Sequence, residues 1–176
     1  MTPIPATVAE QRFRDVFSHL GAVTAYAHRR GSADADALAA ETMAIAWRRL
    51  ADVPSDDPLP WLYGTARNLL LAEARRAARR TVLREPDPFT PPPELHDLDP
   101  QLEHALRALR PLDREALLLV AWEDLTPAQA ARVLGIGATA FRVRLLRARR
   151  RLRAQLEAAP HVHQAAQLAH VDVEGT

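Results

Sequence analysis

The sequence predicts an all-α fold of two small helical domains joined by a proline-rich, acidic linker. Apolar residues recur at helical spacing in both halves, and no segment alternates with a two-residue period for long enough to be a strand. Hydrophobic residues make up 48% of the 176 residues and aromatic residues only 5%, which suits helical cores better than sheets. Six of the 14 prolines lie in residues 86–100, where neither helix nor sheet can continue. We therefore expect a first domain at 8–82, a flexible linker at 83–100, a second domain at 101–157 and a disordered tail at 158–176.

Three helices are predicted in the first domain. The first spans residues 8–30 and stops at Gly31, which suits the left-handed position after a helix. The second spans residues 34–50, with Ser32 or Asp34 as its N-cap. The third begins after residue 57, where a proline fits because the first amides of a helix have no intrahelical partner.

The arginines form two basic islands. Residues 67–84 hold six arginines and one acid, Glu73, and residues 142–153 hold seven arginines and no acid. Acidic residues dominate the segment between them, from Glu85 to Glu103. Two basic islands on either side of an acidic connector predict two contact surfaces for a polyanion.

The strongest local signal lies at residues 126–136. Thr126 can cap a short helix that has Pro127 at its first position and ends at Gly135, and a last helix follows at about 138–157. A short capped helix, a glycine-containing turn and a second helix are what a helix-turn-helix requires. Two further helices, near 100–109 and 113–123, complete the second domain.

The last helix has two distinct faces. At about 100° per residue, one narrow stripe must face the domain, and it consists of Phe141, Leu145, Ala148 and Leu152. The opposite face carries Val143 and Leu146 among arginines. This combination suits a major groove, because apolar atoms can meet a thymine methyl while arginine reads guanine or holds phosphate. No acid offers the arginines an i,i+4 partner, which favours a nucleic-acid partner over a plainly solvated face.

Several classes of protein are excluded by what the sequence lacks. There is no cysteine, which excludes disulfides and cysteine-based metal sites and fits a reducing cytoplasm. No apolar run approaches the roughly 18 residues of a membrane span. There is no glycine-rich phosphate loop, hydrolase elbow or cofactor motif. The tail histidines His161, His163 and His170 lack the acids or cysteines that would complete a metal site. We therefore predict no catalysis, no cofactor, no metal and no membrane insertion.

Motifs in both halves resemble those of extracytoplasmic-function sigma factors, small members of the sigma-70 family. Residues 34–48, DADALAAETMAIAWR, resemble region 2.2, and residues 61–68, WLYGTARN, resemble region 2.3. The arginine-rich turns that follow resemble region 2.4, and residues 109–149 resemble region 4. The resemblance covers roughly residues 10–156, and the presence of both regions in this order, separated by a linker, is highly specific.

The resemblance implies a promoter-specificity subunit of bacterial RNA polymerase with three contact surfaces. The second helix would dock on the clamp helices of the largest core subunit, through Asp34, Asp36, Leu38, Glu41 and Trp47. The third helix would hold the melted −10 element, through Trp61, Arg67, Asn68, Arg75, Arg76, Arg79 and Arg80. The last helix would read the −35 element while its domain rests on the flap of the second-largest subunit, through Thr139, Arg142, Val143, Arg144, Leu146, Arg147 and Arg150. The resemblance also implies an anti-sigma protein as a partner.

Two departures from the family pattern concern core binding. Many relatives carry a second acid where this chain has Ala37, and a glutamine where it has Ala40. The last helix also starts with Gly137 in place of the Ser-Pro that is often found there, a change of a few tenths of a kcal/mol in capping.

Two other functions stay open: a stand-alone helix-turn-helix regulator, and a sigma mimic that sequesters another regulator.

Overall fold

The computed structural model describes residues 6–80 and 99–158, and all regular secondary structure in these residues is α-helical. The all-α prediction is confirmed. The predicted linker lies almost wholly outside the described residues, and the predicted tail lies outside them after Ala158. The helices are α1 (Ala6–Phe17), α2 (Leu20–Arg29), α3 (Ala35–Arg48), α4 (Leu59–Arg80), α5 (Pro100–Arg107), α6 (Pro111–Ala121), α7 (Pro127–Leu134) and α8 (Ala138–Ala158).

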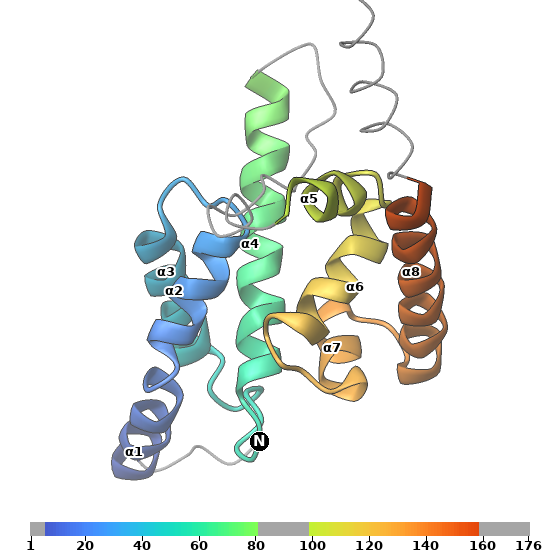
Figure 1. Cartoon of the computed structure of the whole chain (residues 1–176). Helices are drawn as coiled ribbons and strands as arrows, with labels where there is room; N and C mark the ends of the chain where they lie inside the picture. The colour runs from blue at the N-terminus through green and yellow to red at the C-terminus, as the bar shows by residue number, and fades with distance from the viewer. Residues whose placement is uncertain (1–5, 81–98, 159–176) are drawn as a thin grey trace, which may run out of the picture.

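The prediction of one continuous helix over residues 8–30 is wrong, because the chain turns between α1 and α2. The Ser18 hydroxyl donates to the carbonyl of Asp15 at 2.6 Å. The amide of His19 then donates to the carbonyl of Val16 at 3.1 Å, a tighter turn than the α-helical one. A serine hydroxyl that bonds to nearby backbone competes with the helical ladder. This break lets α1 lie below α2 in Figure 1 and gives it a direction of its own.

Local capping signals end α2 and begin α3 as the sequence predicts. Gly31 has a φ of 71°, in the left-handed region that favours glycine. Asp34 is the N-cap of α3, and its carboxylate accepts a hydrogen bond from the amide of Ala37 at 2.9 Å. These caps satisfy backbone groups that a helix end leaves without partners. They set the α2–α3 hairpin that packs on α4.

The two helical halves pack against each other along α4. Figure 1 shows α4 between α1–α3 on one side and α6–α8 on the other, with its C-terminal turns projecting beyond the other helices. Buried apolar residues from both halves form one continuous cluster. The approach of α7 is close: a Cβ added at Gly64 would lie 3.6 Å from the carbonyl oxygen of Val133. The linker is therefore not the only connection between the halves.

Candidate nucleic-acid interface

The helix-turn-helix is built from α7, a glycine turn and α8. The Thr126 hydroxyl accepts from the amide of Gln129 at 3.3 Å, and the Gln129 side chain accepts from the amide of Thr126 at 2.9 Å. Gly135 ends α7 with a φ of 65°, and the amide of Ile136 donates back to the carbonyl of Ala131 at 3.0 Å. A capping box at one end and a left-handed cap at the other fix the length of α7. They thereby fix the direction in which α8 leaves.

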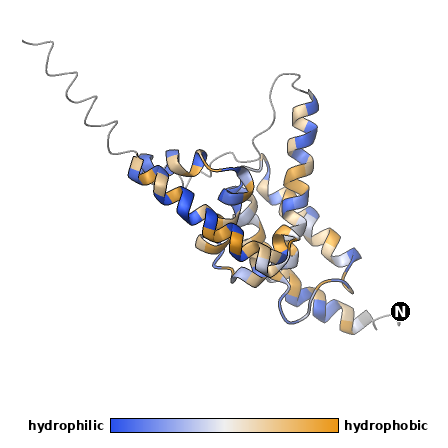
Figure 2. Cartoon of the chain, turned by 90° about the vertical axis from the view of Figure 1, so that its right-hand side faces the viewer, coloured by the Kyte–Doolittle hydropathy of each residue, from blue (hydrophilic) through white to orange (hydrophobic). Residues whose placement is uncertain are grey.

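The faces of α8 are those that helical periodicity predicts. Phe141, Leu145 and Ala148 are buried, whereas Val143 is 42% exposed and Leu146 is 51% exposed. Figure 2 turns α8 toward the viewer and shows hydrophilic residues predominating along it, with hydrophobic patches between them. Large apolar side chains left in solvent among arginines are unusual for a solvated surface. They match the mixed chemistry of a major-groove contact.

The polar residues predicted to read the −35 element differ in their partners. Arg144 lies on the flank of α8, and its Nη1 donates to Oδ1 of Asp113 on α6 at 3.0 Å. The others are exposed, and in the described part of the chain no ion pair engages their arginines. These exposed residues are Thr139, Arg142, Arg147 and Arg150.

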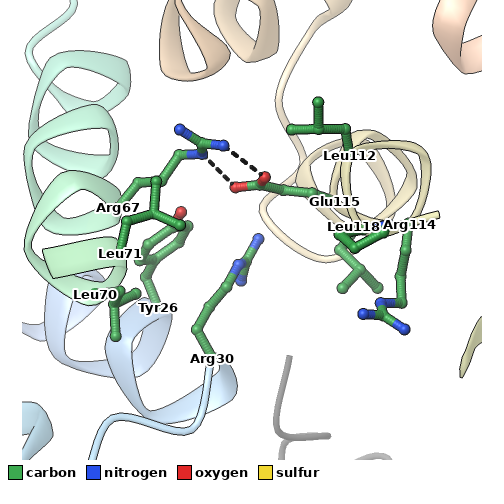
Figure 3. Close-up of a pocket in the computed structure, with 10 residues that line it drawn as sticks. Tyr26, Arg30, Arg67, Leu70, Leu71, Leu112, Arg114, Glu115 and Leu118 are labelled. Atoms are coloured by element: carbon green, nitrogen blue, oxygen red, sulfur yellow. Dashed lines mark hydrogen bonds and ion pairs between the residues drawn. The ribbon is translucent and has the colours of Figure 1, made fainter. Parts of the chain in front are cut away.

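The surface of α4 predicted to hold the −10 element is partly covered by the second half of the chain. Nε and Nη2 of Arg67 donate to the two carboxylate oxygens of Glu115 on α6, at 2.6 and 3.0 Å (Figure 3). Trp61 is half-buried, and it borders a cleft whose opposite wall is the end of α7. Asn68 remains exposed. We call this docking of the two halves the closed arrangement. In it, the guanidinium of Arg67 is engaged in an ion pair with Glu115.

Two further sets of ion pairs join the halves. Glu123 at the end of α6 is 8% exposed, and its carboxylate accepts from Nε of Arg29 at 3.2 Å and from Nη1 of Arg30 at 2.9 Å. Just before the start of α4, Asp57 pairs with Arg132 of α7, and this pair is partly exposed. Hydrogen bonds between charged groups are stronger than neutral ones, and burial protects those of Glu123 from salt. These contacts stabilise the closed arrangement.

An aromatic stack lies beneath the Glu123 cluster. The rings of Tyr26 and Tyr63 stack with centroids 4.6 Å apart, and the guanidinium of Arg30 lies 4.1 Å from the Tyr26 ring. Burial raises the pKa of both tyrosines to about 12, and the Glu123 carboxylate adds to the shift of the Tyr63 pKa. Both phenols therefore stay neutral. Beside them, α2, α4 and α6 enclose a cavity of about 250 Å³ whose walls include Leu70 (Figure 3).

Among the described residues, the basic end of α4 is not covered by the helices of the second half. Arg75, Arg76 and Arg79 are exposed on the turns that project beyond the other helices (Figure 1). Arg80 is the last residue of α4, and its side chain lies outside the described part. Exposed guanidinium groups along a projecting helix suit contact with a phosphate backbone.

The outer face of α3 carries most of the residues predicted to bind core polymerase. Asp34, Asp36 and Glu41 are exposed, and Trp47 is 47% exposed at the other end of the helix. Leu38 is only 2% exposed. It packs in the core, so it can support this surface but cannot itself contact a partner.

Sequence reasoning missed an aromatic extension of this surface. Phe13 of α1 packs edge-on against Trp47 with centroids 4.9 Å apart, and Phe17 beside it is 47% exposed. The i,i+4 spacing of the two phenylalanines is a helical pair signal that could have indicated the patch. Glu115 and Glu123, whose ion pairs join the halves, have no pattern in the sequence around them that indicates this role.

The described residues form neither a metal-binding cluster nor a membrane-spanning helix. No group of three or more histidine, aspartate or glutamate side chains there could hold a metal ion. No helix in that part is both long enough and apolar enough to cross a bilayer. His161, His163 and His170 lie outside the described residues.

Comparison with known proteins relates each half to a known family model. Residues 16–80 match "Sigma-70 region 2", and residues 100–152 match "Sigma-70, region 4". A similar solved structure is the sigma factor RpoE in complex with the anti-sigma factor NepR from Bartonella quintana. It has 22% identity, covers 83% of this chain and 96% of that one, and gives a TM-score of 0.59, a likeness of fold. A second is CnrH in complex with the cytosolic domain of CnrY, with 27% identity, coverage of 86% and 96%, and a TM-score of 0.58. None of the curated proteins compared with the chain matches it.

Proposed function

Since the chain belongs to the sigma-70 family, we propose that three of its surfaces divide the work of a sigma subunit: α3 binds core RNA polymerase, α4 holds the −10 element and α8 reads the −35 element. The chain is a promoter-specificity subunit of RNA polymerase and not an enzyme. One observation supports these three roles most strongly: regions 2 and 4 follow one another on one chain, and each has its own charged surface.

The role of α8 rests on its exposed face. Val143 and Leu146 can meet thymine methyl groups, and Arg142 and Arg147 can donate to guanine or to phosphate. Phosphate contacts give affinity and register, whereas base contacts give selectivity. A helix that offers both kinds of group, and is held rigidly by α7, suits duplex recognition.

The role of α4 requires the closed arrangement to open. A melted −10 strand needs a surface against which its unstacked bases can pack. In the closed arrangement that surface is partly covered, because α7 lies beside Trp61 and Glu115 forms an ion pair with Arg67. We infer that core polymerase separates the halves when it binds them. The two modules, each weak alone, then act together on one promoter through their effective concentration.

The role of α3 rests on its exposed acids and on the aromatic patch beside it. Asp34, Asp36 and Glu41 supply negative charge for steering, and Trp47 with Phe13 supplies apolar area. Aromatic side chains dominate the energy of many interfaces, while charges at the rim set the rate and register of association.

An anti-sigma protein is the proposed regulatory partner, and the cytoplasm is the proposed site of action. Support comes from RpoE, which was solved with its anti-sigma factor and shares the fold of this chain. A protein that binds both halves at once would favour the closed arrangement, because ligands shift an equilibrium toward the state that they bind better.

Replacing Arg147 with alanine tests whether α8 reads promoter DNA. We expect holoenzyme affinity for a promoter that the chain serves to fall about tenfold to hundredfold, the loss expected for one bidentate base contact of about 1–3 kcal/mol. Core binding should be unchanged. The measurement is a binding titration of holoenzyme on labelled promoter duplex, with Arg153→Ala as the matched change near the end of the helix. Undiminished promoter binding by Arg147→Ala would favour the sigma-mimic alternative.

A further inference from the structure

A single buried acid, Asp113, holds two arginines of the recognition helix. It is the third residue of α6 and is 3% exposed. Its Oδ1 accepts from Nη1 of Arg144 at 3.0 Å, and its Oδ2 accepts from Nη1 of Arg151. The two arginines are seven residues apart, about two helical turns, so they lie on the same flank of α8.

The arginines of α8 therefore fall into two classes. Arg144 and Arg151 each share the charge of Asp113 at the wall of a cleft between the start of α6 and α8. Exposure does not separate the classes, because the side chain of Arg151 is 44% exposed. The ion pair does: the other arginines of α8 have none in the described part of the chain, and these are Arg142, Arg147, Arg149, Arg150 and Arg153. A guanidinium neutralised by a buried carboxylate displaces fewer counterions from DNA than a free one, so it adds less to affinity that is independent of sequence.

We propose that Asp113 is a specificity-determining residue, because it holds Arg144 and Arg151 away from the DNA phosphates. The free arginines and apolar side chains of α8 then dominate its contact with the −35 element. This inference rests on the proposed role of α8. It reassigns Arg144, which the family resemblance places among the DNA-binding residues, to the support of the reading face.

A purely structural role for Asp113 predicts a different result. An acid in the first turn stabilises a helix through the dipole, and the ion pairs also join α6 to α8. If that were its whole role, loss of the charge would weaken the fold and DNA binding together. Release of two masked arginines instead increases binding to DNA of any sequence.

The first test measures DNA affinity against salt for full-length Asp113→Asn on a short duplex of arbitrary sequence. Loss of the one negative charge that Arg144 and Arg151 share should steepen the log–log salt slope by up to about 0.9, so that about threefold to fourfold more affinity is lost between 50 and 200 mM salt. Affinity at low salt should rise. Asp124→Asn is the matched control, because it removes the same charge from an exposed side chain of the same half. Its slope should change much less.

A neighbouring pair of variants tests the same inference without disturbing Asp113. Arg150→Gln should flatten the salt slope by up to about 0.9, the share of one free cation. Arg151→Gln should flatten the slope less, because in the unmodified chain Asp113 holds Arg151 away from the phosphates. Equal flattening by the two variants would overturn the inference, even if Asp113→Asn failed to fold.

Two outcomes separate the role of Asp113 from the role of α8. A folded Asp113→Asn variant with weaker DNA binding and an unchanged slope would show a structural role only, and the inference would be wrong. If the unmodified chain showed no salt-dependent DNA binding at all, the proposed role of α8 would fail, and the inference would fail with it.

Discussion

Glu115→Gln/Glu123→Gln opens the chain and exposes the −10 surface of α4. In the described residues, both carboxylates bond only to side chains of the first half, so their loss acts on the contact between halves. Removing one partner of a buried ion pair costs about 3–5 kcal/mol, and Glu123→Gln leaves Arg29 and Arg30 without their counter-charge. The pair at Glu115 is partly solvated and adds less. We expect the closed form to lose at least about a hundredfold in relative population.

Small-angle scattering measures this opening as a rise in the radius of gyration. Binding of the free chain to single-stranded DNA should rise with it, because Arg67 is released. The double variant Asp52→Asn/Asp124→Asn is the control, since it removes the same two charges from exposed side chains that do not join the halves. An unchanged radius of gyration in the glutamine variant would show that the ion pairs of Glu115 and Glu123 do not hold the halves together.

Asp36→Arg/Glu41→Arg abolishes most binding to core RNA polymerase. Both acids lie exposed on the outer face of α3, and neither has an ion pair in the described residues, so their reversal leaves the fold intact. Placing like charges together across an interface costs several kcal/mol. We therefore expect core affinity to fall by at least about a hundredfold, measured by titrating labelled chain with purified core enzyme.

The control for this reversal is Asp56→Arg/Glu157→Arg, which changes the net charge equally at exposed positions outside α3 that have no ion pair in the described residues. It should bind core almost as well as the unmodified chain. The prediction is wrong if the α3 variant binds core polymerase as tightly as the unmodified chain and has the same melting temperature. The acids of α3 would then lie outside the core-binding surface, and the aromatic patch around Trp47 would have to bind core polymerase without them.

The helices of this protein follow from local signals in the sequence, and for that reason they were predictable. The cap at Asp34, the glycines Gly31 and Gly135 and the capping box at Thr126 all act within a few residues. The missed break between α1 and α2 lies at Ser18 and His19, where the serine hydroxyl bonds to the carbonyl of Asp15 and the amide of His19 bonds to that of Val16. Serine is common inside helices as well, so its presence at position 18 did not identify the turn.

The candidate site was predictable where it depends on one helix and not where it depends on two. Periodicity placed Val143 and Leu146 on the outer face of α8, and they are exposed there. The contacts of Arg67 with Glu115 and of Arg30 with Glu123 join residues 48 and 93 positions apart. No pattern along the chain pairs such residues, because the ion pairs exist only after the halves have docked.

Mapping the 5′ ends of transcripts shows whether the chain directs RNA polymerase to promoters. Purified core RNA polymerase would transcribe chromosomal DNA with and without the full-length chain. We predict new start sites that require the chain and that share two sequence blocks, one near −10 and one near −35, with the α3 variant producing few of them. The account would be contradicted if a folded chain produced no new starts, or if it bound a palindromic site tightly without core polymerase, as a stand-alone regulator does.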